Sequence, residues 1–159
     1  MQFTYEFEAF EEDGWICVYP FDMKGATSGK DRAEAADMAA DWLRMEIEHR
    51  LMHGIGIPKP SFGNELQKNG YIMIVSVEVS LDTINKVTAS KAAEILGVTP
   101  ARISHMIRDG LLTAFRDGNR TWVTRDSINA RLADNRRAGR PRKKAETTAV
   151  PLQSAHMTG

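Results

Sequence analysis

The sequence predicts an α+β protein with an acidic, sheet-rich N-terminal part and a basic, mainly helical C-terminal part. Residues 3–9 alternate apolar and polar side chains, which is the period of a half-buried strand. Residues 31–52 instead repeat apolar side chains at helical spacing. Residues 1–85 contain 7 Lys and Arg against 15 Asp and Glu, a net charge of −8, whereas residues 86–159 contain 14 against 6, a net charge of +8. This division favours an acidic module joined to a nucleic-acid-binding module.

Two strands and a turn open the chain. The alternating run Phe3–Ala9 predicts the first strand, and Trp15–Tyr19, rich in residues that favour strands, predicts the second. Asp13-Gly14 between them marks a reversal. We therefore expect an antiparallel hairpin with a slightly long loop, followed by an irregular loop after Pro20.

A long helix and a third strand complete the first module. Asp31 and Glu34 form a capping-box pattern, so we expect a helix from there to about Met52. Tyr71–Val79 is apolar enough to predict a central strand, which makes the order ββαβ. The predicted core-facing stripe of the helix consists of Ala35, Met38, Ala39, Trp42, Leu43 and Met45.

Two short helices separated by a tight turn follow a hinge at residues 81–86. Thr88 is positioned to cap a helix over residues 89–96, and Gly97 can end it in the left-handed conformation. Thr99 caps the second helix, with Pro100 at its first position. Apolar spacing turns Ile103, Met106 and Ile107 inward. The side chains left pointing outward are Arg102, Ser104, His105 and Arg108, a set that the DNA major groove accepts.

A β-hairpin with a basic tip follows the two helices. Residues 111–116 and 121–123 predict its strands, and Arg116, Asn119 and Arg120 lie at or near the turn. The two arginines suit contacts with phosphates or the minor groove. A last helix is expected over Arg125–Ala133.

The run from Thr88 to Thr99, together with Ile107–Ala114 and Arg116–Trp122, resembles the excisionase/MerR-like winged helix-turn-helix family. The resemblance covers about 45 residues and implies a DNA-binding domain over residues 87–135. The alternative is a helix pair that serves only dimerisation. The predicted DNA-binding residues are Thr99, Arg102, Ser104, His105, Arg108, Arg116, Asn119, Arg120, Arg137 and Arg140.

Residues 3–79 resemble the HicB antitoxin family. The resemblance is carried by Asp13-Gly14-Trp15, Tyr19–Asp22, Gly25–Gly29, Asp31–Ala35 and Ile57–Ser61, in that order. It implies a partial RNase H-like domain over residues 1–82 without nuclease activity, and a HicA-like toxin RNase as partner. We place the expected toxin contacts at Phe21, Asp22, Met23 and Lys24, where this sequence lacks the family's usual prolines.

Residues 136–159 form a basic tail without apolar periodicity, which predicts disorder. Gly139-Arg140-Pro141 resembles the centre of an AT-hook, although Ala138 stands where that motif has an arginine. A tail that binds phosphates without sequence preference and a merely solvated tail are the alternatives.

Candidate catalytic groups each have a simpler explanation. Asp13, Asp22 and Asp31 could serve a two-metal nuclease, but the sequence also assigns them to a turn, a loop and a helix cap. His49 and His53 have metal-compatible spacing without an evident third ligand. The lone Cys17, expected to be buried mid-strand, suits a reducing cytoplasm. We therefore expect no catalytic residue, no metal and no cofactor.

The two resemblances, with the charge division, imply a cytoplasmic antitoxin that neutralises a HicA-like, mRNA-cleaving toxin and represses its own operon by binding promoter DNA. One such module contacts few base pairs, so we expect at least a dimer. The alternative is a MerR-like transcription regulator whose N-terminal domain senses a ligand or protein. A third hypothesis, an active RNase H-like nuclease, predicts metal-dependent cleavage that Asp22→Ala abolishes.

Overall fold

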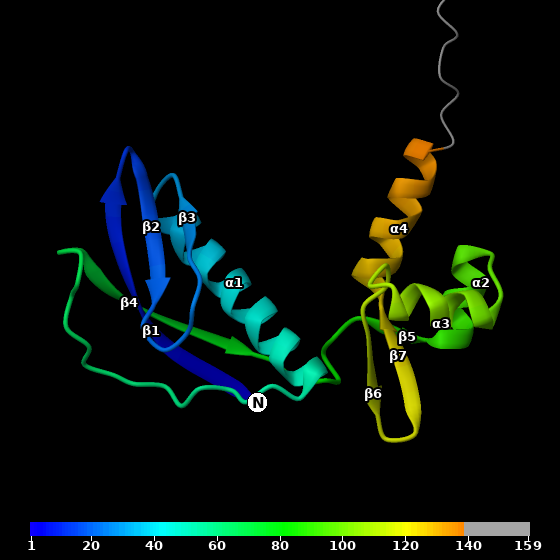
Figure 1. The fold of residues 1–159 in the computed structure, drawn as a ribbon. Coiled ribbons are helices and arrows are strands. Elements are labelled where there is room, and N and C mark those ends of the chain that lie inside the picture. The colour runs from blue at the N-terminus through cyan, green and yellow to red at the C-terminus, as the bar shows by residue number, and fades with distance from the viewer. Residues whose placement is uncertain (139–159) are drawn as a thin grey trace, which may run out of the picture.

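The computed structural model describes residues 1–138 and is of the α+β class (Figure 1). The first sheet is antiparallel, with the strand order β3-β2-β1-β4, and the helix α1 packs on one face of it. Its elements are β1 (Gln2–Glu12), β2 (Trp15–Pro20), β3 (Thr27–Gly29), α1 (Arg32–His53) and β4 (Tyr71–Glu78).

The second group of elements has its own small core and a three-stranded antiparallel sheet in the order β5-β7-β6. Figure 1 shows it as a separate lobe that follows β4. Its elements are β5 (Lys86–Thr88), α2 (Ala89–Leu96), α3 (Pro100–Arg108), β6 (Ala114–Asp117), β7 (Arg120–Thr124) and α4 (Arg125–Ala138).

The β1–β2 hairpin turns more tightly than the sequence analysis predicts. Only Asp13 and Gly14 separate the strands, and both have positive φ, 51° and 78°. Two left-handed residues match the twist of the flanking strands, which is why this turn type joins hairpins directly. Cys17, expected to be buried, is half-buried.

The core of the first sheet lies between β1 and α1. Tyr5, Phe7 and Ala9 share one face of β1 and are buried. Asp31 caps α1 by accepting a hydrogen bond from the Glu34 backbone N–H at 2.8 Å, and Glu34 Oε2 accepts one from the Lys30 N–H at 2.6 Å. The predicted capping pair is therefore present, with the returning carboxylate shifted by one residue.

The predicted stripe of α1 was partly wrong. The buried residues follow a four-residue spacing from Ala35 through Ala39 and Leu43 to Ile47. Met38 and Met45 lie off this row and are 41% and 61% exposed, because the contact with the sheet is a narrow ridge. Trp42 is half-buried and packs edge-on against Phe7, with ring centroids 5.9 Å apart.

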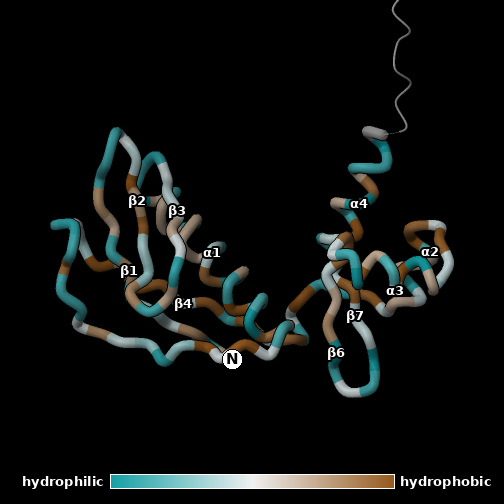
Figure 2. Tube along the Cα trace, in the orientation of Figure 1, coloured by the Kyte–Doolittle hydropathy of each residue, from teal (hydrophilic) through white to brown (hydrophobic). Residues whose placement is uncertain are grey.

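Three predictions about strands were wrong. Thr27–Gly29, expected to be loop, forms β3 on β2, so the order is βββαβ. Lys86–Thr88, at the end of the predicted hinge, forms β5 on β7. Tyr71–Glu78 is an edge strand, not a central one. Figure 2 shows much of β4 in the hydrophobic colours. This apolar character has two sources: Val75 and Val77 face the core, whereas Ile72 and Ile74 remain 36% and 64% exposed.

The last helix is longer than predicted. It continues from Arg125 to Ala138, so the first three residues of the predicted tail are helical. Within residues 1–138, no helix has both the length and the apolar character needed to cross a membrane.

Candidate functional site

Two helices, α2 and α3, are held at a close crossing by small buried residues. Thr88 caps α2 by accepting a hydrogen bond from the Lys91 N–H at 3.2 Å. Gly97 ends the helix with φ of 65°, and a side chain at that backbone angle would be strained. Ala92 and Ala93 of α2 are buried with Ile103 of α3, which lets the helix axes approach.

The opposite face of α3 is open and carries the predicted DNA-binding side chains. Arg102, Ser104, His105 and Arg108 are all exposed. Thr99, also exposed, serves as the helix cap, because its hydroxyl accepts a hydrogen bond from the Arg102 N–H at 3.2 Å. Pro100 has no N–H, the Arg102 N–H donates to the Thr99 hydroxyl and the Ile103 N–H donates to the Thr99 carbonyl oxygen. The face therefore offers exposed side chains, and not free backbone donors, to a partner.

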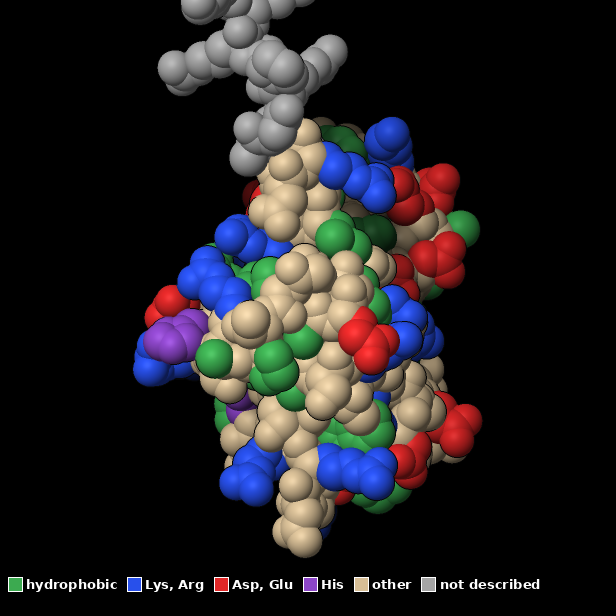
Figure 3. Space-filling model, turned by 90° about the vertical axis from the view of Figure 1, so that its right-hand side faces the viewer, with side chains coloured by type: hydrophobic (Ala, Val, Ile, Leu, Met, Phe, Trp, Pro, Cys, Tyr) green, Lys and Arg blue, Asp and Glu red, His purple; other side chains and the backbone are tan. Residues whose placement is uncertain are grey.

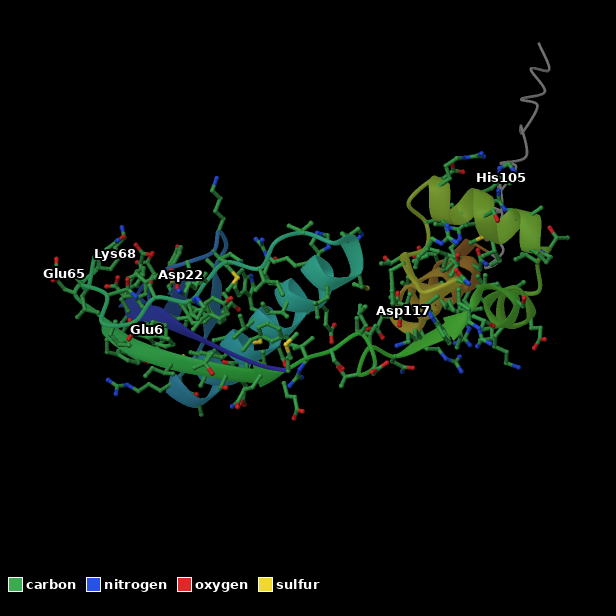
Figure 4. The ribbon with its side chains drawn as sticks, turned by 90° about the horizontal axis from the view of Figure 1, so that it is seen from below. Glu6, Asp22, Glu65, Lys68, His105 and Asp117 are labelled. Atoms are coloured by element: carbon green, nitrogen blue, oxygen red, sulfur yellow. The ribbon has the colours of Figure 1, made fainter. Side chains whose placement is uncertain are left out.

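Local contacts modify two of these side chains. The Ser104 hydroxyl donates to the Pro100 carbonyl of its own helix at 3.4 Å. His105 Nδ1 contacts the Arg108 guanidinium on the same exposed face (His105 is labelled in Figure 4). Because a guanidinium can only donate, this hydrogen bond needs Nδ1 as its acceptor.

The hairpin β6–β7 projects a second basic group. Arg116, Asn119 and Arg120 are exposed at its tip, where Gly118 turns the chain with φ of 59°. At its base, the Lys86 ammonium lies 5.7 Å and 5.4 Å from the ring centroids of Phe115 and Trp122. Figure 3 shows Lys and Arg side chains spread over this side of the molecule, with a few acidic side chains among them.

The two tail arginines cannot be placed. Arg140 lies outside the described residues, and of Arg137 only the helical backbone is described. The AT-hook prediction, at residues 139–141, likewise falls outside the described part of the chain.

The predicted toxin contacts do not form one exposed set. Phe21, Asp22, Met23 and Lys24 line a shallow hollow of about 340 Å³ together with Arg50. Within it, Lys24 is exposed, Phe21 is half-buried, and Met23 is only 8% exposed. The Asp22 carboxylate is already occupied, because it accepts hydrogen bonds from the Ser61 N–H at 2.9 Å and the Ser61 hydroxyl at 2.7 Å.

Two glutamates of β1 that the sequence analysis did not single out are buried on the sheet face opposite α1. Glu6 accepts hydrogen bonds from the backbone N–H groups of Gly63 and Asn64 at 2.9 and 3.0 Å. Glu8 accepts from the N–H groups of Gln67 and Lys68 at 2.8 and 2.6 Å, and from that of Gly70 at 3.4 Å. With Asp22, they hold the segment 57–70, here called the strap, against the sheet.

Five backbone N–H groups of the strap lower the pKa values of these two glutamates. Hydrogen bonds from Gly63 and Asn64 lower the Glu6 pKa. Burial alone would raise the Glu8 pKa, but the N–H groups of the strap outweigh it and leave that pKa below its usual range. Figure 4 shows Glu6 and Asp22 close to one another in the sheet domain, near Glu65 and Lys68 of the strap. The signal in the sequence was two carboxylates alternating with aromatic residues along one strand.

The remaining candidate catalytic groups have structural contacts. Asp13 lies in the hairpin turn and Asp31 caps α1. His53 Nδ1 lies 2.8 Å from the His49 carbonyl oxygen, and the two rings are tilted by 39° with centroids 4.3 Å apart. Within residues 1–138, no group of three or more His, Cys, Asp or Glu side chains is placed to hold a metal ion.

A groove of about 680 Å³ lies between α1 and the second lobe. Met38, Met45 and Met52 line its α1 side, and Glu48 of α1 and Asp126 of α4 both face it. Partial burial and, to a lesser extent, the Asp126 charge raise the Glu48 pKa, while Arg44 lowers it.

Glu48→Gln is expected to raise the melting temperature modestly at neutral pH. A raised folded-state pKa means that ionised Glu48 is less favourable in the folded than in the unfolded chain. Protonated Glu48 therefore stabilises the fold. This contribution is fully present below the ordinary glutamate pKa and is lost as the pH rises through the raised folded-state pKa of Glu48. The rise in melting temperature that Glu48→Gln gives at neutral pH should therefore disappear in acid. Thermal melts at both pH values test this, with Asp37→Asn, exposed on the same helix, as the control. A gain of equal size in acid would contradict it.

Comparisons with known proteins are sparse. No family model matches the sequence, and no curated protein matches it. A chain of a solved toxin-antitoxin complex from Streptococcus pneumoniae is similar, with 21% sequence identity and a TM-score of 0.47. The similarity covers 69% of this chain and 99% of that chain. Function is therefore inferred below from the geometry and charge of this chain.

Proposed function

We propose that this protein is an antitoxin that neutralises a HicA-like toxin RNase and represses its own operon by binding promoter DNA. Residues 1–82 form the toxin-binding domain, residues 87–135 form a winged helix-turn-helix domain, and the chain has no catalytic activity. The observation that supports the proposal most directly is the open face of α3, along which four polar or cationic side chains are exposed.

The dimensions of this face suit duplex DNA. An α-helix fits the major groove, and arginine reads guanine through two parallel hydrogen bonds. Arg102 and Arg108 lie six residues apart on α3, at opposite ends of its exposed face. The hairpin tip supplies a second contact: Arg116 and Arg120 reach the flanking backbone or minor groove, as a wing does.

The charge division supports two different partners. The first 85 residues carry a net charge of −8, which repels DNA and attracts a basic RNA-binding protein. The remaining residues carry +8 and favour phosphates. Each half therefore discriminates against the partner of the other half.

Co-expression tests the toxin-binding half. The full chain is expressed with the product of any neighbouring reading frame that encodes a small basic protein. We expect the chain to co-purify with that protein and to restore growth that the protein alone arrests. Growth arrest that persists despite full-length expression of both proteins would contradict the antitoxin role, whatever the result of a DNA-binding assay.

A ligand-sensing regulator is the second candidate. The groove between α1 and the second lobe favours it, because its three methionines form an adaptable apolar lining. This function predicts DNA binding that responds to a small molecule and no effect on a neighbouring toxin. The co-expression experiment therefore separates the two functions.

Removing residues 139–159 is expected to weaken the salt dependence of DNA binding. This segment contains Arg140, Arg142, Lys143 and Lys144 against one acidic residue, Glu146. Each phosphate neutralised adds about 0.9 to the slope of log affinity against log salt, so we expect the slope to decrease by roughly 3. Fluorescence anisotropy at several salt concentrations measures it. An unchanged slope would mean that the tail does not contact DNA.

A further inference from the structure

The free edge of β4 is the longest unpaired strand edge in the described part of the chain. β4 runs for 8 residues and pairs only with β1, whereas β3 at the other end of the sheet has 3 residues. Figure 4 shows β4 along the margin of this domain. Native proteins protect such edges with charges, prolines or a covering segment. β4 has no proline and a single charged residue, Glu78.

Apolar side chains lie beside this edge on the face that the strap partly covers. Ile72 and Ile74 pair across the sheet with Glu8 and Glu6, the residues that hold the strap. Ile74 is 64% exposed. Phe62 and Leu66 of the strap are also exposed. On this face of β4, Ile72 and Ile74 are apolar, and Ser76 and Glu78 are polar.

From this edge we infer that two copies of the chain associate by antiparallel pairing of β4 with β4. A two-fold axis perpendicular to the sheet would join the two four-stranded sheets into one and place Ile74 of each copy at the centre. Helix α1 of both copies would then cover the same face, and the straps would lie together on the other.

Charge favours a second copy over a basic protein at this edge. Residues 57–80 contain Lys59, Lys68, Glu65 and Glu78, a net charge of zero, so the −8 of the first 85 residues lies entirely elsewhere. The strap and β4 therefore add no net charge to a pairing of two copies, and Glu6 and Glu8 on the neighbouring β1 already accept hydrogen bonds from the strap. A basic partner gains more from the remaining acidic surface. Pairing centred on Ile74 also places Glu78 opposite the partner's Gly70, so the two Glu78 carboxylates do not meet.

The paired length of β4 allows about as many hydrogen bonds as a specific protein interface usually has. Eight residues span about 26 Å at the usual rise per residue. Antiparallel pairing over that length supplies roughly eight backbone hydrogen bonds, near the usual number for a specific protein interface. A dimer also supplies two copies of α3, the number that a repeated or palindromic DNA site requires.

Light scattering coupled to size-exclusion chromatography tests the inference on the full chain. We expect wild type to have about twice the chain mass of 17.8 kDa and Ile74→Lys to have the monomer mass. Met45→Lys is the matched control, because Met45 is exposed to a similar extent, 61%, but lies on α1. It should remain dimeric. A monomeric wild type, or an Ile74→Lys variant that remains dimeric, would overturn the inference.

Oxidative cross-linking supplies a second readout that does not depend on the folding of the lysine variant. In a Cys17→Ala background, Ile74→Cys is expected to form an interchain disulfide, because equivalent residues face each other near the two-fold axis. Met45→Cys should not. Failure of cysteines at positions 72, 74 and 76 to cross-link would exclude this pairing. None of these results depends on the toxin or on DNA, so the inference can fail while the proposed function holds.

Discussion

Replacing Arg102 and Arg108 together with alanine is expected to lower affinity for the chain's own promoter by roughly a hundredfold or more, because a paired arginine–guanine contact contributes about 1–3 kcal/mol of discrimination. Both guanidinium groups are exposed on the open face of α3. Neither contributes to the buried cluster of the second lobe, so the variant should fold normally. The loss should therefore appear in binding and not in the melting temperature.

Two comparisons make this experiment specific. Arg44→Ala removes an exposed arginine from α1 of the acidic domain and should leave affinity unchanged. Binding to unrelated DNA should fall much less than binding to the promoter, because phosphate contacts from the hairpin remain. A double variant that still shifts promoter DNA in a gel at physiological salt would mean that α3 is not the reading helix.

Features set by neighbouring residues could be predicted from the sequence. Thr88, Gly97 and Thr99 each act within a few residues, through a cap hydrogen bond or a left-handed backbone angle. Such local chemistry leaves a distinct pattern: α2 begins and ends, and α3 begins, where that pattern places them. The open face of α3 followed from the same spacing, since Ile103 and Met106 had to turn inward.

Features set by distant residues could not be predicted in the same way. An apolar strand has the same sequence pattern whether a second strand, a helix or a second molecule covers it. For this reason β4 was predicted to be central, although it lies at the edge of the sheet. The strap contacts join residues 39 to 62 positions apart, and most of their donors are backbone groups that carry no side-chain signal. The contact between Asp22 and Ser61 is of this kind, and the toxin contact predicted for Asp22 stays a prediction.

The strap makes Glu8 the carboxylate whose loss should most affect stability. Glu8 is 3% exposed and accepts three backbone N–H groups. In Glu8→Gln, the new amide nitrogen is a donor facing donors, so at least one N–H loses its acceptor. A buried donor without a partner costs about 1–3 kcal/mol, which in a domain of this size lowers the melting temperature by roughly 10 °C.

The pH dependence of Glu8→Gln separates this contact from a general packing defect. Because the strap lowers the Glu8 pKa, its stabilising contribution is fully present above the ordinary glutamate pKa and is lost as the pH falls through the lower folded-state value. The difference in melting temperature between wild type and Glu8→Gln should therefore be largest at neutral pH and should become smaller in acid. Glu65→Gln, the same change at an exposed position of the strap, should melt with wild type at every pH. Because Glu6 binds the same strap and its pKa is also lowered, Glu6→Gln should repeat the pattern. If the melting temperature of Glu8→Gln stayed below that of wild type by the same amount from neutral to acid pH, side-chain packing, and not the ionised carboxylate, would hold the strap.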